Sequence, residues 1–264
     1  MNYSVLLTDY DPDRIETLSR GVAEVYRILP LDAQQRLRHG WGFLERETSA
    51  PRAAEIVAAL TERGVRAQAI ANDQLRQTEP PLVMLGFAAD ADGFTPALQD
   101  PQAASRAVRW DEIAIVAAGG FSEETMRREA GKSQVQMPSM IGLGIFLTTG
   151  IPVGMFRGRQ PKNKKPVKAT RFISFGQIVT TRGESFFGNP EHFDFSCLGE
   201  KKQVNASLNF RFFIAWFAER SSARLNLGAR CVLGNKSLSL ANYQSLHDFE
   251  TELLWMINTA GSPA

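Results

Sequence analysis

The stretch SVLLTDYDPDRIETLSRGVAEVY, residues 4–26, decides the fold of the first part of the chain. Residues 4–7 are a short apolar run that predicts a buried strand. Asp11 followed by Pro12 is typical of a helix start, because aspartate caps the free amides and proline fits the first helical position. Apolar side chains then recur every three or four residues, which places them on one face of a helix ending near Tyr26. They are Ile15, Leu18, Val22 and Val25.

The pattern continues to about residue 72 and predicts one small domain. Residues 31–38 favour a second helix, and residues 42–44 are a brief extended run. Thr48 or Ser49, followed by Pro51, opens a third helix that Gly64 ends, because glycine accepts the left-handed conformation found after a helix. Residues 65–69 alternate between apolar and polar, as in a strand with one face exposed to solvent. The order βααβαβ over residues 1–72 follows, and we expect residues 1 to about 75 to fold alone.

This segment resembles the C-terminal domain of the bacterial ribosomal stalk protein, which recruits translation GTPases. The resemblance rests on a pattern of alanines, leucines and a terminal glycine that runs through Ala33, Ala53, Leu60, Gly64 and Val65. It covers about a quarter of the chain and implies a βααβαβ fold. It does not imply the same function, because the basic and aliphatic factor-binding positions on the first helix are occupied here by Glu16, Ser19 and Ala23.

A second family of this topology, the N-degron adaptor of the Clp protease, is similar at residues 5–9. Its peptide pocket has acidic and amide groups after the first strand and a histidine on the second helix. Asp9 could stand in for the acidic group, but His39 falls two residues short of the family's spacing from Ala33. We therefore expect His39 to be a partly exposed side chain at a helix end.

Composition sets the outer limits. With 264 residues and 44% hydrophobic content, the chain can bury at least one full core, and a second, larger domain is expected after the first. Cys197 and Cys231 have no paired spacing, which argues against a disulfide scaffold or a zinc site. The net charge of +2 selects no class of partner. The first residues lack a basic region followed by an apolar stretch, so we expect no export signal and a cytoplasmic protein.

The rest of the chain predicts a linker at residues 73–81 and a β-rich domain at residues 82–264. Residues 82–88 and 94–98 flank a turn and form an expected hairpin. Further strands are expected at 110–118, 172–180, 193–198, 204–214 and 223–233, with the aromatic run 210–217 at the centre of the sheet or at an oligomer interface. A helix over residues 242–258, capped by Asn242 or Ser239, closes the domain. The fold class is α+β, and the element order of the second domain is similar to a pleckstrin-homology-type arrangement.

Residues 133–156 carry no charged side chain. The part 137–156, MPSMIGLGIFLTTGIPVGMF, has the length of a membrane span and precedes a cluster of cations. Pro138, Pro152 and four glycines lower its hydrophobicity and helix propensity. Three readings stay open: a connection packed against the second domain, a surface for a membrane or a partner, and a span.

Residues 157–171 hold seven cations and no acid, with Pro161 and Pro166 preventing a regular helix. Such a loop can bind the phosphates of nucleic acid or of an anionic membrane surface. It can equally be a solvated loop, since no aromatic side chain lies among the cations to stack on bases. The tentative anion-binding residues are Arg157, Arg159, Lys162, Lys164, Lys165 and Lys168.

Motifs of catalysis are weak throughout the chain. Gly131-Lys132-Ser133 imitates the end of a phosphate-binding loop but lacks its first glycine, and no dinucleotide fingerprint is complete. His192 lies near Asp194 and Cys197, yet in an extended strand only the first two share a face. We therefore predict no catalytic, cofactor or metal site. The sequence favours a non-enzymatic protein-interaction or regulatory role, with another protein as partner. The alternative is a polyanion binder that acts through residues 157–171. The oligomeric state of the protein stays open.

Overall fold

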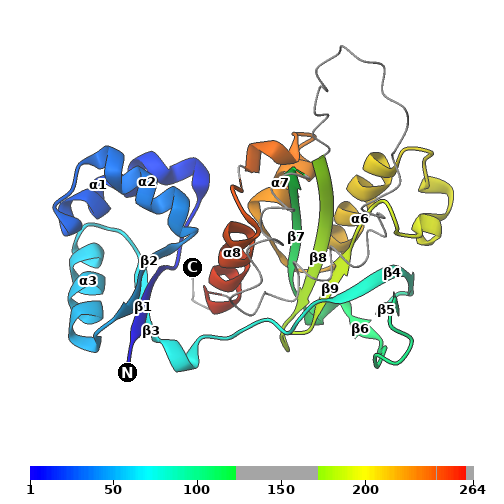
Figure 1. The fold of residues 1–264 in the computed structure, drawn as a ribbon, viewed down its shortest axis with the longest axis horizontal. Coiled ribbons are helices and arrows are strands. Elements are labelled where there is room, and N and C mark those ends of the chain that lie inside the picture. Colours follow the sequence, from blue (N-terminus) through cyan, green and yellow to red (C-terminus); the bar gives the residue numbers. More distant parts are fainter. Residues whose placement is uncertain (123–171, 242, 260–264) are drawn as a thin grey trace, which may run out of the picture.

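The computed structural model describes residues 1–122, 172–241 and 243–259 (Figure 1). The uncharged segment 133–156, the phosphate-loop-like residues 131–133 and the basic residues 157–171 lie outside these ranges. The predicted anion-binding residues Arg157, Arg159, Lys162, Lys164, Lys165 and Lys168 therefore stay predictions from the sequence.

The first part of the chain has the βααβαβ order, and the fold is α+β. Its three strands form an antiparallel sheet in the order β2-β1-β3. The bounds are β1 (Tyr3–Leu7), the 3-10 turn η1 (Pro12–Arg14), α1 (Ile15–Tyr26), α2 (Pro30–Gly40), β2 (Phe43–Thr48), α3 (Ala50–Glu62) and β3 (Ala67–Ala71).

Local sequence explains these boundaries. The Asp11 side chain accepts a hydrogen bond from the Asp13 amide at 3.2 Å, and Pro12 occupies the first helical position as expected. Gly64, with φ of +71°, follows α3 in the left-handed conformation. The predicted inward faces of α1 and α3 are buried at Leu18 and Ile56, whereas Ala69 of β3 is exposed and the predicted alternation there is wrong.

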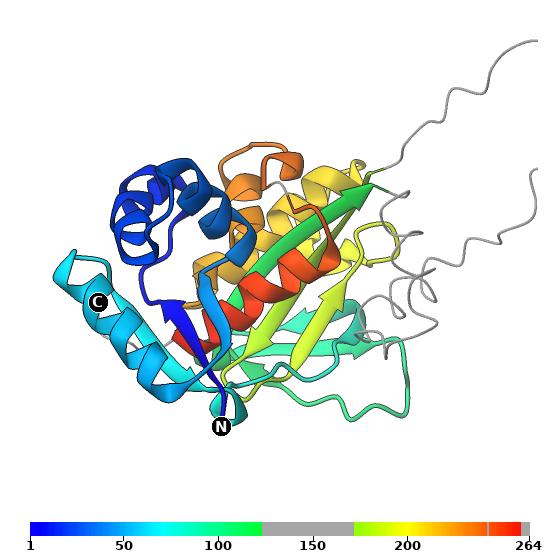
Figure 2. The ribbon, with the colours of Figure 1, turned by 60° about the vertical axis from the view of Figure 1, so that its left-hand side comes forward.

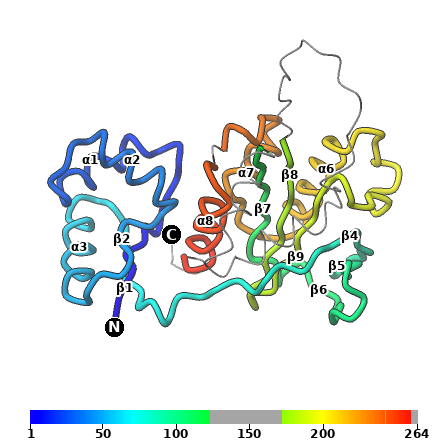
Figure 3. The backbone as a smooth tube through the Cα atoms, viewed as in Figure 1, coloured from blue at the N-terminus to red at the C-terminus, as the bar shows by residue number. Residues whose placement is uncertain are grey.

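The second sheet contains seven strands in the order β10-β7-β8-β9-β4-β5-β6. β10 with β7 and β4 with β9 are parallel pairs, and the other neighbours are antiparallel. The segment between the sheets contains the 3-10 turn η2 (Asn72–Gln74) and runs on to β4 (Figure 3). The bounds are β4 (Leu82–Ala89), β5 (Gly93–Leu98), β6 (Val108–Arg109), the 3-10 turn η3 (Trp110–Glu112), β7 (Ile113–Ser122), β8 (Phe172–Thr180), β9 (Ser185–Gly188) and β10 (Arg224–Leu225).

Helices cover both faces of this sheet (Figure 2). A methyl group built on Gly176 would lie 2.9 Å from Phe213 of α6, and one built on Gly119 would lie 3.0 Å from Phe249 of α8. Because both faces are covered, β7 reads as a continuous apolar run rather than an alternating one. The remaining elements are η4 (Phe195–Lys201), α6 (Ala206–Arg220), α7 (Leu227–Leu233), η5 (Leu238–Ala241) and α8 (Leu246–Thr259).

Three of the strands predicted for this part of the chain are wrong. Residues 193–198 belong mainly to the 3-10 element η4, 204–214 to α6, and 223–233 to the short strand β10 and α7. In α6, Phe210, Phe213 and Phe217 face inward at helical spacing, and Asn205 caps the first amides. An aromatic run suits a buried strand and a buried helix equally well, so the sequence pattern could not separate them.

The pleckstrin-homology-type comparison is also not supported. It assumed antiparallel strands closed by one C-terminal helix, whereas the described strands include two parallel pairs in one open sheet. The C-terminal helix itself is confirmed, with Phe249 and Leu253 buried. It begins at Leu246 rather than at 242, because Ser245 accepts the bond from the Asp248 amide at 3.2 Å.

Helix α8 lies between the two sheets and joins them into one apolar cluster (Figure 1). The Trp255 indole donates to the Leu7 carbonyl at 2.6 Å, and Gln68 of β3 donates to the Asn258 carbonyl at 3.1 Å. On its other side, Phe249 packs edge-on against Phe175 of β8. Within the described ranges, no helix is long and apolar enough to cross a membrane.

Candidate functional site: a cavity between the small sheet and the α7–α8 corner

A cavity of about 560 Å³ lies where the helices of the first part meet the α7–α8 corner of the second. We call it the junction cavity. Its walls come from four places far apart in the sequence: the turn after β1, the C-terminal half of α2, the start of α7, and η5 with the start of α8. The lining residues are Tyr10, Pro12, Asp13, Ile15, Gln35, Arg38, His39, Trp41, Leu227, Leu240, Ala241, Gln244 and Asp248.

Aromatic side chains on the cavity wall are held by neighbours from the other half of the chain. Tyr10 meets the Trp255 ring edge-on, with the ring centres 5.4 Å apart. Trp41 lies against Tyr243, with the ring centres 4.8 Å apart and the planes tilted by 31°. The cavity wall is therefore rigidly packed from behind, and its shape depends on the contact between the two sheets.

Trp41 has an unusual backbone and an unmet hydrogen-bonding group. Its φ of +47° places an aromatic residue in the left-handed region, which costs free energy. Gly42 follows with φ of +92°, and a methyl group there would lie 2.4 Å from the Trp255 ring. The Trp41 side chain is only 5% exposed, yet its indole nitrogen has no acceptor among the described residues.

Charges of both signs line the cavity. Arg38 and His39 lie in the last turn of α2, are exposed, and make no ion pair with any described residue. Asp248 is already engaged, because one of its oxygens accepts the Gln244 amide at 2.7 Å. Asp13 lies on the opposite element, η1. Leu240, 62% exposed, adds an apolar group to the α7–α8 wall.

A buried polar network supports the α7–α8 wall. The Glu252 carboxylate, 2% exposed, accepts hydrogen bonds from the Tyr243 hydroxyl and from the Leu227 amide, the latter at 2.9 Å. Asn226 exchanges a pair of hydrogen bonds with the backbone of Ala118 in β7, at 2.9 and 3.0 Å. The network ties α7, α8 and β7 together directly behind the cavity residue Leu227.

Burial raises the pKa of Glu252 above its ordinary value of 4.5, although the hydrogen bonds from Tyr243 and Leu227 oppose the shift. Burial and the neighbouring Glu252 charge together raise the pKa of Tyr243. A buried carboxyl beside a cavity is typical of functional sites. Here each oxygen already has a partner, so the network acts as a support for the wall.

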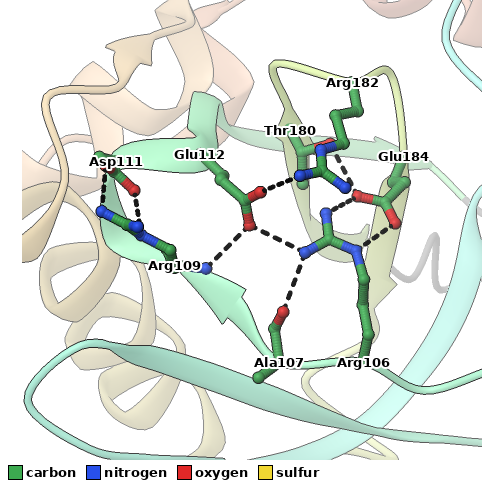
Figure 4. A network of polar contacts seen from close by, with 8 residues as sticks. All are labelled: Arg106, Ala107, Arg109, Asp111, Glu112, Thr180, Arg182 and Glu184. Carbon is green, nitrogen blue, oxygen red and sulfur yellow. Dashed lines mark hydrogen bonds and ion pairs between the residues drawn. The ribbon is translucent and has the colours of Figure 1, made fainter.

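A second charged cluster shares no residue with the cavity, and its charges pair with one another (Figure 4). Arg106 binds Glu184 and, at 2.8 Å, Glu112, while Arg182 binds the other oxygen of Glu112 at 3.0 Å. Hydrogen bonds from Arg106 hold the pKa of both glutamates below the usual 4.5. Because every charge in this cluster is satisfied from within, it fastens the segment before β6 to the β8–β9 hairpin.

A smaller cavity of about 360 Å³ shares His39 with the junction cavity. Its other charged groups are engaged: Arg36 binds Glu45 at 2.8 Å and Arg46 donates to Thr251 at 3.3 Å. Of the two cavities, the junction cavity is the one lined by an arginine, Arg38, that makes no ion pair or side-chain hydrogen bond with any described residue.

The residues singled out in the sequence are placed as follows. Asp9, the acid that the adaptor comparison singled out, pairs with Arg14 and Arg66 at 3.0 and 3.1 Å. His39 is an exposed residue near the end of α2, as predicted, and it lines both cavities. Asp194 caps η4 through the Ser196 amide.

His192 and Cys197 do not combine into a site with Asp194. Burial raises the pKa of the Cys197 thiol to about 11, which makes it a poor nucleophile. Among the described residues, no three histidine, cysteine or acidic side chains are placed to hold a metal ion. Trp110 and Trp255 are buried and Trp216 is half-buried.

Sequence reasoning missed the residues that build the cavity. Trp41, Tyr243 and Glu252 carry no motif, and they come together only through long-range packing. One usable signal was Trp41-Gly42, an aromatic and a glycine directly after a helix, which marks a left-handed helix end.

Comparison of the chain with protein-family models, with curated proteins and with solved structures finds no match.

Proposed function

We propose that the chain is a protein-interaction module that binds a short peptide segment of another protein in the junction cavity. The observation that carries this proposal is the lining: Trp41 and Tyr10 form aromatic walls, with Arg38 and Leu240 beside them. Trp, Tyr and Arg are the residues that dominate binding energy at protein interfaces. A volume of 560 Å³ also falls within the usual range for ligand cavities, roughly 300 to 1,000 Å³.

The support behind the cavity agrees with a binding role. Rigid walls lower the free-energy cost of ordering a site when a ligand binds. The Trp41–Tyr243 contact and the Glu252 network supply such rigidity from two directions. The buried carboxyl of Glu252 is fully engaged by its neighbours, which suits a support for a binding site better than a general acid or base.

The proposal can be tested by panning a random heptapeptide phage library against the full chain. Enriched peptides are then synthesised and their affinities measured by fluorescence polarisation. Gln35→Trp places a large side chain over the cavity from an exposed helix position, and we expect it to weaken binding at least tenfold. Gln74→Trp, at an exposed position outside the cavity, is the matched control and should change the affinity by less than about twofold. Peptides that bind all three proteins equally would contradict the proposal.

Polyanion binding through residues 157–171 is the second candidate function, and the seven cations of that segment favour it. Neutralising Lys162, Lys164 and Lys165 should then flatten the salt dependence of heparin binding by up to about three units in the log-log slope. If peptide binding is the function, we expect only weak retention on heparin at ~150 mM salt. Tight retention that the triple substitution abolishes would favour the polyanion reading.

A further inference from the structure

The junction cavity presents several hydrogen-bond donors that have no acceptor among the residues that the structure describes. Gln35, Arg38 and His39 are spaced three and four residues apart, so they lie on one face of α2. All three line the cavity, and within the described ranges none makes a side-chain hydrogen bond or ion pair. Trp41, directly after the helix, also lines the cavity, and its ring lies against Tyr243.

Three donors on one wall of a cavity favour a ligand group that offers more than one acceptor oxygen. The Trp41 ring beside them is fixed in place, because Tyr243 packs against it and the side chain is almost completely buried. The guanidinium of Arg38 favours a carboxylate, since its donors match the two carboxylate oxygens.

The acids in the cavity limit how much negative charge it can accept. Asp248 has one oxygen committed to the Gln244 amide, and Asp13 lies on η1, an element distinct from α2. A second acidic group placed near Asp13 would be repelled. The lining therefore suits one carboxylate at the α2 wall, with apolar groups against Tyr10, Ile15 and Leu240.

We infer that the peptide bound in the junction cavity carries a single carboxylate, which Arg38 receives together with Gln35 and His39. This inference rests on the proposed function, because it names the chemical class of the partner segment. The carboxylate can belong to an Asp or Glu side chain or to the C-terminus of the partner.

The two sources are separated by the form of the library. One heptapeptide library is displayed internally, so that carboxylates come only from side chains, and the other is displayed with a free C-terminus. We expect peptides that depend on the cavity to be enriched in Asp and Glu in the first library, or to lose binding when C-terminally amidated in the second. Arg38→Gln should weaken these peptides at least tenfold, and Arg38→Lys should restore part of the loss.

Arg20→Gln is the matched control, because Arg20 is an exposed arginine of α1 that does not line the cavity. It should leave the affinity unchanged. Peptides that lose binding in Gln35→Trp but carry no carboxylate, or that bind Arg38→Gln normally, would overturn this inference and leave the proposed function standing. If no peptide responds to Gln35→Trp, both proposals fail.

Discussion

Trp255 is the side chain that most directly links the two halves of the molecule. Its ring packs against Tyr10 and over Gly42, and its indole nitrogen donates to the Leu7 carbonyl at 2.6 Å. Gly42 has no side chain, so the ring can approach the backbone this closely. Arg224 also lies over the ring, 4.8 Å from its centre. The contact is buried, so water cannot replace its hydrogen bond, and losing the bond should lower the free energy of unfolding.

We predict that Trp255→Phe lowers the free energy of unfolding by about 1 to 3 kcal/mol or more, because it leaves the buried Leu7 carbonyl without this donor and opens a small gap. Urea denaturation followed by circular dichroism measures the change. Trp216→Phe is the matched control, since the Trp216 nitrogen has no acceptor in the described part of the chain and its removal costs no hydrogen bond. Equal losses in the two variants would show that the Trp255 bond contributes nothing.

A second prediction concerns Glu252. Its raised pKa fixes the direction in which the stability of the protein depends on pH. A carboxyl whose pKa is higher in the folded state favours folding while it is protonated. This contribution is fully present below the unfolded-state pKa of 4.5 and is lost as the pH rises through the folded-state pKa. Glu252→Gln cannot ionise, so its stability relative to the natural chain should improve as the pH rises above 4.5. Denaturation curves between pH 4 and 8 that run parallel for both proteins would contradict the raised pKa.

Single residues could be predicted from the sequence where the cause is local. Asp11 with Pro12 and the glycine at 64 were assigned correctly, because a cap or a left-handed turn depends on neighbours in the chain. Trp41 and Glu252 could not be assigned, since their roles depend on Tyr243 and Leu227, which lie far away in the sequence or on another element.

At the scale of elements, α1 offers a test of the predicted helix face. Leu18 is 7% exposed and packs into the cluster shared with α8. Leu18→Ala should lower the free energy of unfolding by roughly 2 to 4 kcal/mol, through lost burial and the cavity left behind. Leu29→Ala, at a leucine that is mostly exposed, should change it by less than about 0.5 kcal/mol. A negligible effect at Leu18 would remove the support for this face of α1.

The segment before β6 is fastened by Arg106, and here the pH dependence has the opposite sign. The pKa of Glu112 and of Glu184 is lowered in the folded state, so their contribution is present above the unfolded-state value of 4.5 and is lost as the pH falls below it. Arg106→Gln should therefore reduce stability at pH 7. It should also make the fall of stability at low pH less steep. Arg109→Gln breaks only an exposed pair with Asp111 and serves as the control. Acid unfolding that is identical in all three proteins would contradict this role.

A helix or strand could be predicted where its sequence pattern fits only one kind of secondary structure. The hairpin of β4 and β5 and the strand β8 follow from alternation and turn residues, and both are confirmed. Helix α6 was mistaken for a strand because it is apolar on several sides: Phe213 faces the sheet while Leu208 and Phe212 are exposed. A helix without a clear polar face has no period by which to recognise it.

For the whole molecule, the sequence indicated two parts but not how they meet. The two sheets share an apolar cluster through α8, the last described helix, although the first sheet is complete by residue 71. Independent folding of residues 1–75 stays a prediction, and we expect the isolated segment to be less stable than in the full chain because it loses Trp255. The junction cavity is a consequence of the same packing, since no single part of the chain forms its walls.

The most direct test of peptide binding in this cavity is the NMR signal of the Trp41 indole N–H. The chain has four tryptophans, and the Trp41 signal can be assigned by its absence in Trp41→Phe. On titration with a peptide selected as above, we predict that this signal shifts because the peptide changes the surroundings of the Trp41 ring on the cavity wall, while that of Trp110, which does not line the cavity and is bonded to the Ala91 carbonyl, stays in place. A Trp41 signal that does not move while the peptide binds would contradict binding in the junction cavity.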